Sequence, residues 1–157
     1  MTIVLGNESV ELEYDGVTEG MGNITLYFPN QKALYLVDRV VFERLPYLDL
    51  SEIYVDNYIS SLKTLLSKDF TLVLPGHGVT GNKNDINKFI QYMETLRTEV
   101  VKNLDEGKTM QETRPLVEAK MQKFNNLGMY KDWIGMNIDG MYYQMCNLAA
   151  RCRNNPM

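Results

Sequence analysis

The sequence is poor in the residues that build metal and redox centres: it has one histidine, His77, and two cysteines, Cys146 and Cys152, among 157 residues. A lone imidazole lacks the spaced histidine and cysteine motifs that indicate a metal site. Because a spacing of six residues would place the cysteines on different faces of a helix, we expect both to be reduced. Reduced cysteines favour a cytoplasmic location.

Other classes of protein are disfavoured by further absences. No run of eighteen apolar residues exists, so we expect no transmembrane helix. The opening residues Met1–Gly6 have neither the basic start nor the apolar stretch of a signal peptide. The formal net charge of −4 does not favour nucleic acid or an anionic membrane as a partner. The chain, with 45% apolar and 23% charged residues, is expected to form one globular domain over residues 1–157.

The apolar pattern changes from strand-like to helix-like along the chain. Alternation of apolar and polar residues predicts strands, and apolar stripes at helical spacing predict helices. The expected strands cover residues 2–5, 10–14, 24–28, 33–37 and 71–74. The expected helices cover 55–66, 86–104 with Asn82 or Asn84 as N-cap, a segment after Thr109 that Pro115 should break or restart, and 138–152. This order favours an α+β fold, a sheet with helices on one side.

Three residues carry possible chemistry. His77 lies in Pro75-Gly76-His77-Gly78 after a buried strand, where it could ligate a metal or act as a base, or simply pack in a tight turn. Asp38 ends the buried strand Ala33–Val37 and is either a turn former or a site residue. Glu19 lies in a loop with three glycines, which is either a flexible loop or a segment with unusual backbone angles.

The glycines at 76, 78 and 81 also spell the pattern of a dinucleotide-binding turn. Their context differs from that of such a turn. Several strands precede the glycines, helical sequence follows, and the helix is expected to start after them, away from a bound pyrophosphate.

Residues 9–80 resemble the metallo-β-lactamase superfamily. The resemblance lies in the segment Glu13–Pro29, in the strand Lys32–Asp38 that ends in the family's bridging aspartate, and in Phe70–Gly78 with the last histidine ligand. It implies half of a four-layer αββα sandwich, the C-terminal half, with a mostly antiparallel sheet. The family's H-x-H-x-D-H motif is absent, and Glu19 stands where the ligand loop normally offers a histidine. The resemblance therefore implies Asp38, His77 and Glu19 as the remaining metal ligands.

Such an incomplete site has consequences for function. A catalytic zinc needs three protein ligands and an open position for water, so we expect no ordinary zinc hydrolysis. The cofactor is expected to be none or a weakly bound divalent metal, zinc by family resemblance, although the carboxylates favour magnesium, calcium or manganese. The chain is expected to be non-catalytic, serving assembly or ligand binding. The alternative is a metal-dependent hydrolase of esters, lactams or thioesters whose site another chain completes.

Half of a sandwich would leave one sheet face bare, which soluble monomers avoid. We therefore expect a homodimer that packs sheet on sheet through this face and completes the fold. Two alternatives are a fragment of a longer protein and a partner that carries the other half. A small-molecule ligand could occupy a pocket of methionines and aromatic residues, or these residues are simply core: Tyr47, Tyr54, Tyr130 and Trp133.

Overall fold

The computed structural model describes residues 1–148. By their internal contacts these residues form two compact units. The first comprises Met1–Glu43 and Glu52–Gln91, and the second comprises Arg44–Ser51 and the chain from Tyr92 onward. The organisation of residues 1–157 as a single domain stays a prediction.

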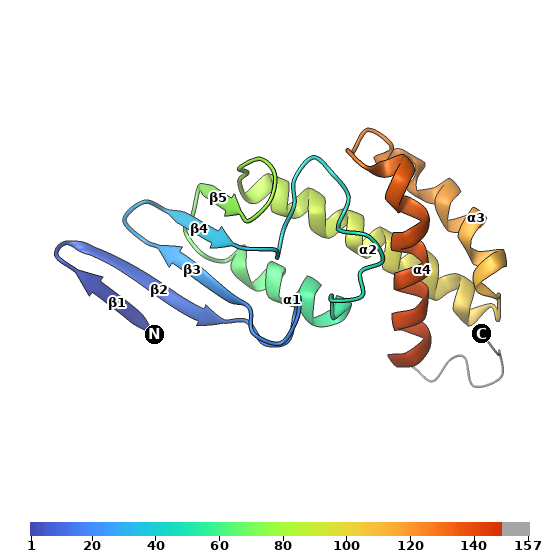
Figure 1. Cartoon of the computed structure of the whole chain (residues 1–157), viewed down its shortest axis with the longest axis horizontal. Helices are drawn as coiled ribbons and strands as arrows, with labels where there is room; N and C mark the ends of the chain where they lie inside the picture. Colours follow the sequence, from blue (N-terminus) through green and yellow to red (C-terminus); the bar gives the residue numbers. More distant parts are fainter. Residues whose placement is uncertain (149–157) are drawn as a thin grey trace. The chain divides into compact units, whose positions relative to one another are not determined.

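The first unit contains a five-stranded sheet in which the strands lie in sequence order (Figure 1). The first three neighbouring pairs are antiparallel, and β4 and β5 are parallel because the chain crosses over between them through α1. The sheet is therefore mostly antiparallel, as the family resemblance implied. Its strands are β1 (Thr2–Leu5), β2 (Glu8–Tyr14), β3 (Ile24–Phe28), β4 (Ala33–Leu36) and β5 (Leu72–Pro75).

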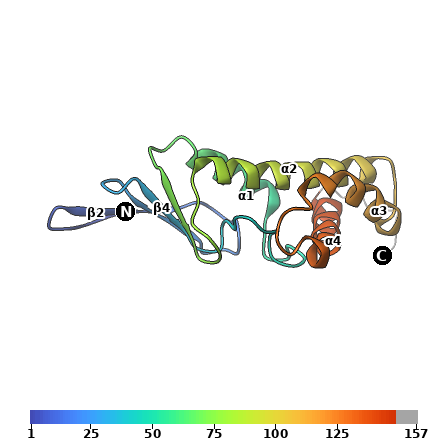
Figure 2. The same ribbon diagram turned by 90° about the horizontal axis from the view of Figure 1, so that it is seen from above.

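Helices α1 (Val55–Leu65) and the first turns of α2 (Lys83–Asp105) lie on one side of this sheet (Figure 2). The sheet residues facing them are fully buried, namely Thr25, Leu34, Leu36 and Val73. On α1 the buried side chains fall at helical spacing, at Val55, Tyr58, Ile59, Leu62 and Leu65. The apolar side chains predicted on the helix and on the strands thus pack in one core. This packing confirms the predicted α+β arrangement.

The opposite face of the sheet is apolar and open. The strand register places Leu12 beside Leu26, Leu26 beside Tyr35, and Tyr35 beside Leu74 on this face. Six apolar side chains of the face are at least 36% exposed: Ile3, Leu5, Tyr14, Ile24, Tyr35 and Leu72. We call this surface the open face. No helix of the first unit covers it within the described residues.

The second unit is helical, with the last turns of α2, then α3 (Met110–Met121), the 3-10 turn η1 (Gln122–Phe124) and α4 (Tyr130–Leu148). Buried Asn137 on α4 anchors the Arg44–Ser51 segment. Its side-chain amide donates to the carbonyls of Pro46 and Leu48 and accepts a 2.7 Å hydrogen bond from the Tyr92 hydroxyl. These bonds satisfy polar groups that would otherwise be buried without partners.

Several predicted helix boundaries are confirmed. Asn82 is the N-cap of α2, since its side-chain oxygen accepts from the Asn84 backbone N–H at 2.8 Å. The capping box of Thr109 and Glu112 starts α3. The break expected at Pro115 is wrong, because α3 runs through this residue. Pro115 lies on the exposed side, where water can bond the carbonyl it leaves unpaired, and buried Thr113, Val117 and Met121 hold the helix in place.

The expectation of reduced cysteines is wrong for Cys146, which is disulfide-bonded. Cys152 lies outside the described residues. The argument from reduced thiols to the cytoplasm therefore no longer applies. Among residues 1–148, no helix has the length and the apolar character required to cross a bilayer.

Candidate functional site

Asp38 and His77 meet at one edge of the sheet. The parallel strands β4 and β5 end side by side, with Leu36 opposite Pro75, and each chain then turns away. His77 Nε2 lies 3.0 Å from Asp38 Oδ1, and the two side chains are 66% and 41% exposed. The sequence predicted both residues as site residues, and the parallel pairing of their strands brings them together.

The backbone around this pair is unusual. Asp38 has a positive φ of 59°, a conformation that aspartate tolerates better than most residues. Gly76 lies against it, since a Cβ on Gly76 would stand 3.2 Å from Asp38 Oδ1 and 3.3 Å from the Asp38 nitrogen. Only a residue without a side chain fits here without displacing Asp38. The glycine before His77 therefore allows the carboxylate and the imidazole to approach each other.

Glu19 is held by the glycine-rich loop that precedes β3. Its backbone pairs with Ile53, and its carboxylate accepts a 3.2 Å hydrogen bond from Asn23 Nδ2. Partial burial raises the pKa of Glu19 to about 7, and the negative charges of Asp38 and Glu52 add to this despite the hydrogen bond from Asn23. Gly16 and Gly20 have positive φ angles of 79° and 67°, which supports unusual backbone angles in this loop.

The three predicted ligands do not form one group. Within residues 1–148, no three side chains of the types His, Cys, Asp and Glu come close enough together to hold a metal ion. Glu19 influences Asp38 electrostatically but does not complete a three-ligand set with Asp38 and His77. These donors do not fit a catalytic zinc site, which needs three protein ligands. The Nδ1 atom of His77 lies outside the 3.0 Å contact of Nε2 with Asp38, so it could bind one ligand.

Sequence reasoning missed Arg39, which directly follows Asp38. Its side chain is fully buried, and its guanidinium bonds Asp15, Thr25 and Ser61. Burial lowers the pKa of Arg39, and the Asp15 carboxylate opposes this effect. The signal in the sequence was a single cation within Val37-Asp38-Arg39-Val40-Val41, where the apolar neighbours indicate a buried position.

The dinucleotide alternative finds no support in the local structure. Helix α2 starts at Lys83, after the glycines, as the sequence predicted. Gly81 instead pairs with Val73 through two backbone hydrogen bonds of 2.8 and 2.9 Å and lies against the ring of Phe42. Close packing therefore accounts for this glycine.

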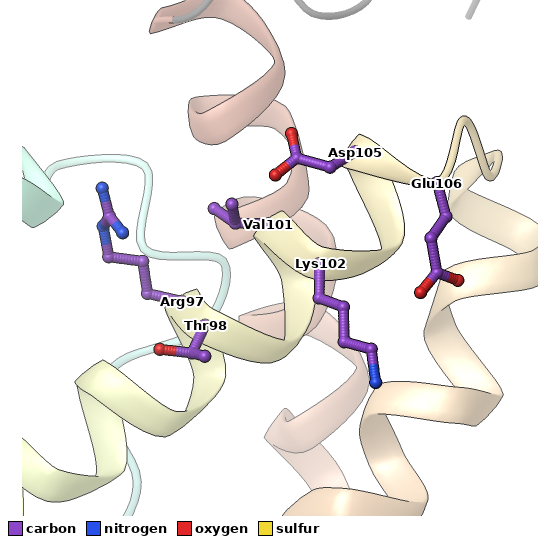
Figure 3. A pocket seen from close by; sticks show the side chains of 6 residues that line it. All are labelled: Arg97, Thr98, Val101, Lys102, Asp105 and Glu106. Carbon is purple, nitrogen blue, oxygen red and sulfur yellow. The ribbon is translucent and has the colours of Figure 1, made fainter.

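The residues proposed for an aromatic ligand pocket have different environments. Tyr130 is buried, and the exposed ring of Tyr47 lies edge-on to Trp133, with 5.4 Å between the centroids. A surface depression of about 500 Å³ lies elsewhere, along the last turns of α2 (Figure 3). Its lining is mostly charged and contains none of the proposed aromatic residues: Arg97, Thr98, Val101, Lys102, Asp105 and Glu106. The aromatic pocket stays a prediction.

Solved structures share part of the arrangement of strands and helices described above. A metallo-β-lactamase from Pontibacter korlensis superposes on 58% of this chain with a TM-score of 0.51 and 19% identity. Part of this chain has the metallo-β-lactamase fold. The match confirms the resemblance stated from the motifs, at the level of the fold. The chain spans 45% of the length of that enzyme.

Two further proteins match a smaller share of this chain. The DIM-1 metallo-β-lactamase exposed to ceftazidime is 28% identical with a TM-score of 0.48, over 57% of this chain and 45% of its own. The curated 2,4-dinitroanisole O-demethylase subunit alpha of Nocardioides sp. (strain JS1661) is 35% identical over 77 residues, which are 49% of this chain and 23% of that protein. No family model matches the sequence.

Proposed function

We propose that this chain is a non-catalytic assembly module of the metallo-β-lactamase fold, which pairs with a second copy through its open face. The observation that carries the proposal is the apolar character of that face, to which all five strands contribute apolar side chains and which is interrupted by Glu8 at the start of β2. Polar side chains alternate onto the water-facing side of most half-exposed sheets. Here the apolar side chains point outward as well, which indicates a surface that is covered in use.

The size of the open face supports an interface. Six apolar residues gathered on one face, each at least 36% exposed, form the kind of large apolar patch that marks a protein–protein contact. Each partner in a standard interface contributes ~800 Å². Two copies related by a two-fold axis would bury the same face on both sides, with the sheets ~10 Å apart.

The donor set supports the non-catalytic part of the proposal. Asp38 Oδ1 and His77 Nε2 lie 3.0 Å apart, and Glu19 does not join them in a group of three ligands within residues 1–148. Two ligands hold a divalent metal weakly and polarise its water poorly. This chain alone is therefore expected to bind a metal only weakly.

The oligomeric state tests the assembly. Size-exclusion chromatography with light scattering is expected to give a dimer at micromolar concentration. Leu72→Asp places a charge on the open face and is expected to give monomers. Its matched control is Leu116→Asp, at a leucine of similar exposure on α3, 46% against 39%, which should leave the dimer intact. A wild-type monomer would refute the proposal.

The second candidate is a metal-dependent hydrolase of ester, lactam or thioester substrates whose site another chain completes. The preformed pair of Asp38 and His77 favours it, because both groups are accessible from solvent. The curated relative is itself named as a subunit, and an association of chains would let a neighbour add ligands. Stoichiometric zinc in protein purified without chelator, lost in His77→Ala, would favour this candidate over the first. Absence of bound transition metal would favour the first.

A further inference from the structure

The residue that follows Asp38 in the chain, Arg39, is a buried cation. Arg39 has no exposed surface, and its guanidinium makes three bonds to other parts of the first unit. Nη1 donates to the carboxylate of Asp15 and, at 2.6 Å, to the hydroxyl of Thr25, and Nη2 donates to Ser61 Oγ at 2.7 Å. Thr25 in turn bonds Asp15 at 2.6 Å. The guanidinium thus ties the loop before β3, β3 itself and α1 to one point.

Stability alone does not account for an arginine at this position. A buried ion pair loses much of its attraction to the cost of removing both charges from water, and apolar residues of similar volume often serve as well. The Arg39 Nε atom is also buried without a partner, which adds to that cost. A residue kept at such a cost is expected to do something that a methionine of similar size would not.

The backbone of Arg39 is fixed as firmly as its side chain. The buried Tyr58 hydroxyl donates to the Arg39 carbonyl, and the Arg39 N–H donates to the Leu36 carbonyl at 3.3 Å. Leu36 and Arg39 are thus both held in place, and Asp38 adopts its positive φ between them. The turn therefore has a fixed start in β4 and a fixed end at Arg39.

We infer that Arg39 is a positioning residue, which locks the turn of residues 36–39 so that the Asp38 carboxylate meets His77. Asp38 lies in a backbone conformation that costs ~1 kcal/mol or more for most residues and that relaxes when its surroundings allow. Without the guanidinium bonds, the turn loses its ties to Asp15, Thr25 and Ser61, and the Asp38 carboxylate moves away from the imidazole. The inference goes beyond the proposed assembly and assumes only that Asp38 and His77 form the candidate site.

The single histidine makes the test direct, because its ring gives one set of NMR signals. Spectra of metal-free protein at one fixed pH are compared for the wild type, Arg39→Met and Asp38→Asn. The signals of His77 in Arg39→Met are expected to move most of the way to those of Asp38→Asn, in which the carboxylate is removed. Lys32→Met, which removes an exposed cation paired with Asp69, is the matched control and should leave them unchanged.

A merely structural role would lower the unfolding free energy without moving these signals in the folded protein. A folded Arg39→Met with wild-type His77 signals would therefore overturn the inference. If Arg39→Met does not fold, Tyr58→Phe removes only the bond to the Arg39 carbonyl. A smaller shift in the same direction supports the inference, and unchanged signals overturn it. The measurement needs neither a dimer nor a metal, so its outcome is separate from that of the proposed function.

Discussion

Gly140 lies directly against the carbonyl oxygen of Asp49, closer than any side chain at this position would allow. Both residues belong to the second unit, where α4 packs on the Arg44–Ser51 segment. A methyl group on Gly140 would overlap the backbone of Asp49, which cannot rotate away as a side chain could. This glycine therefore sets how closely the segment packs on the helix.

Gly140→Ala is accordingly expected to destabilise the protein by about 2–3 kcal/mol, the cost of forcing an extra methyl into a packed contact. Gly135 in the same helix has open space where its Cβ would be. Gly135→Ala should therefore stabilise by about 0.5–1 kcal/mol, the ordinary gain in a helix. Urea unfolding measures both changes. Equal effects of the two variants would show that the contact with Asp49 does not exist.

Gly76→Ala is expected to separate Asp38 from His77. The new Cβ would stand 3.0 Å from Val37 Cγ1 and 3.2 Å from Asp38 Oδ1, so the carboxylate must shift by some tenths of an ångström. We expect a loss of about 1 kcal/mol in unfolding free energy and a change in the NMR signals of His77. Gly22→Ala, where a Cβ meets nothing within 4 Å, is the control. Unchanged signals in Gly76→Ala would contradict the close approach.

Periodicity alone predicted most of the fold. Strand β3 matches its predicted bounds, and the apolar stripe of α1 ends within one residue of the expected position, because burial of one face imposes a repeat on the sequence. The meeting of Asp38 and His77 followed from both lying at the ends of buried strands. The burial of Arg39 did not follow, because its three partners come from distant segments. The anchoring of Leu48 by Asn137 did not follow from periodicity either, because the two residues are 89 positions apart.

The stability of the protein is expected to depend on pH through Glu19. Its pKa in the folded protein, about 7, lies above the ordinary value of 4.5. The folded state therefore binds the proton more tightly, so the stabilisation is complete below pH 4.5 and is lost as pH rises through 7. The full shift corresponds to ~3 kcal/mol, and solvent screening of this half-buried group reduces it to about 1–2 kcal/mol.

Glu19→Gln removes the charge and should stabilise the protein by about 1–2 kcal/mol at pH 8 and have little effect at pH 4. Unfolding free energies at the two pH values measure this difference. Asn23→Ala removes the hydrogen bond that lowers the pKa of Glu19, so it is expected to raise this pKa further. The unfolding free energy should then fall by a larger amount between low and high pH. An equal effect of Glu19→Gln on the unfolding free energy at pH 8 and at pH 4 would contradict the raised pKa.

Asn137→Ala is expected to cost about 3 kcal/mol, because it leaves several buried polar groups without partners at once. The Asn137 amide bonds the carbonyls of Pro46 and Leu48, and its oxygen accepts from the Tyr92 hydroxyl. Each buried group left unpaired costs ~1–3 kcal/mol. Tyr92→Phe removes only the hydroxyl and should cost about 1 kcal/mol. Urea unfolding of both variants and of the double variant measures the coupling. A double variant whose loss equals the sum of the two single losses would show that the amide and the hydroxyl act independently, against the shared bond.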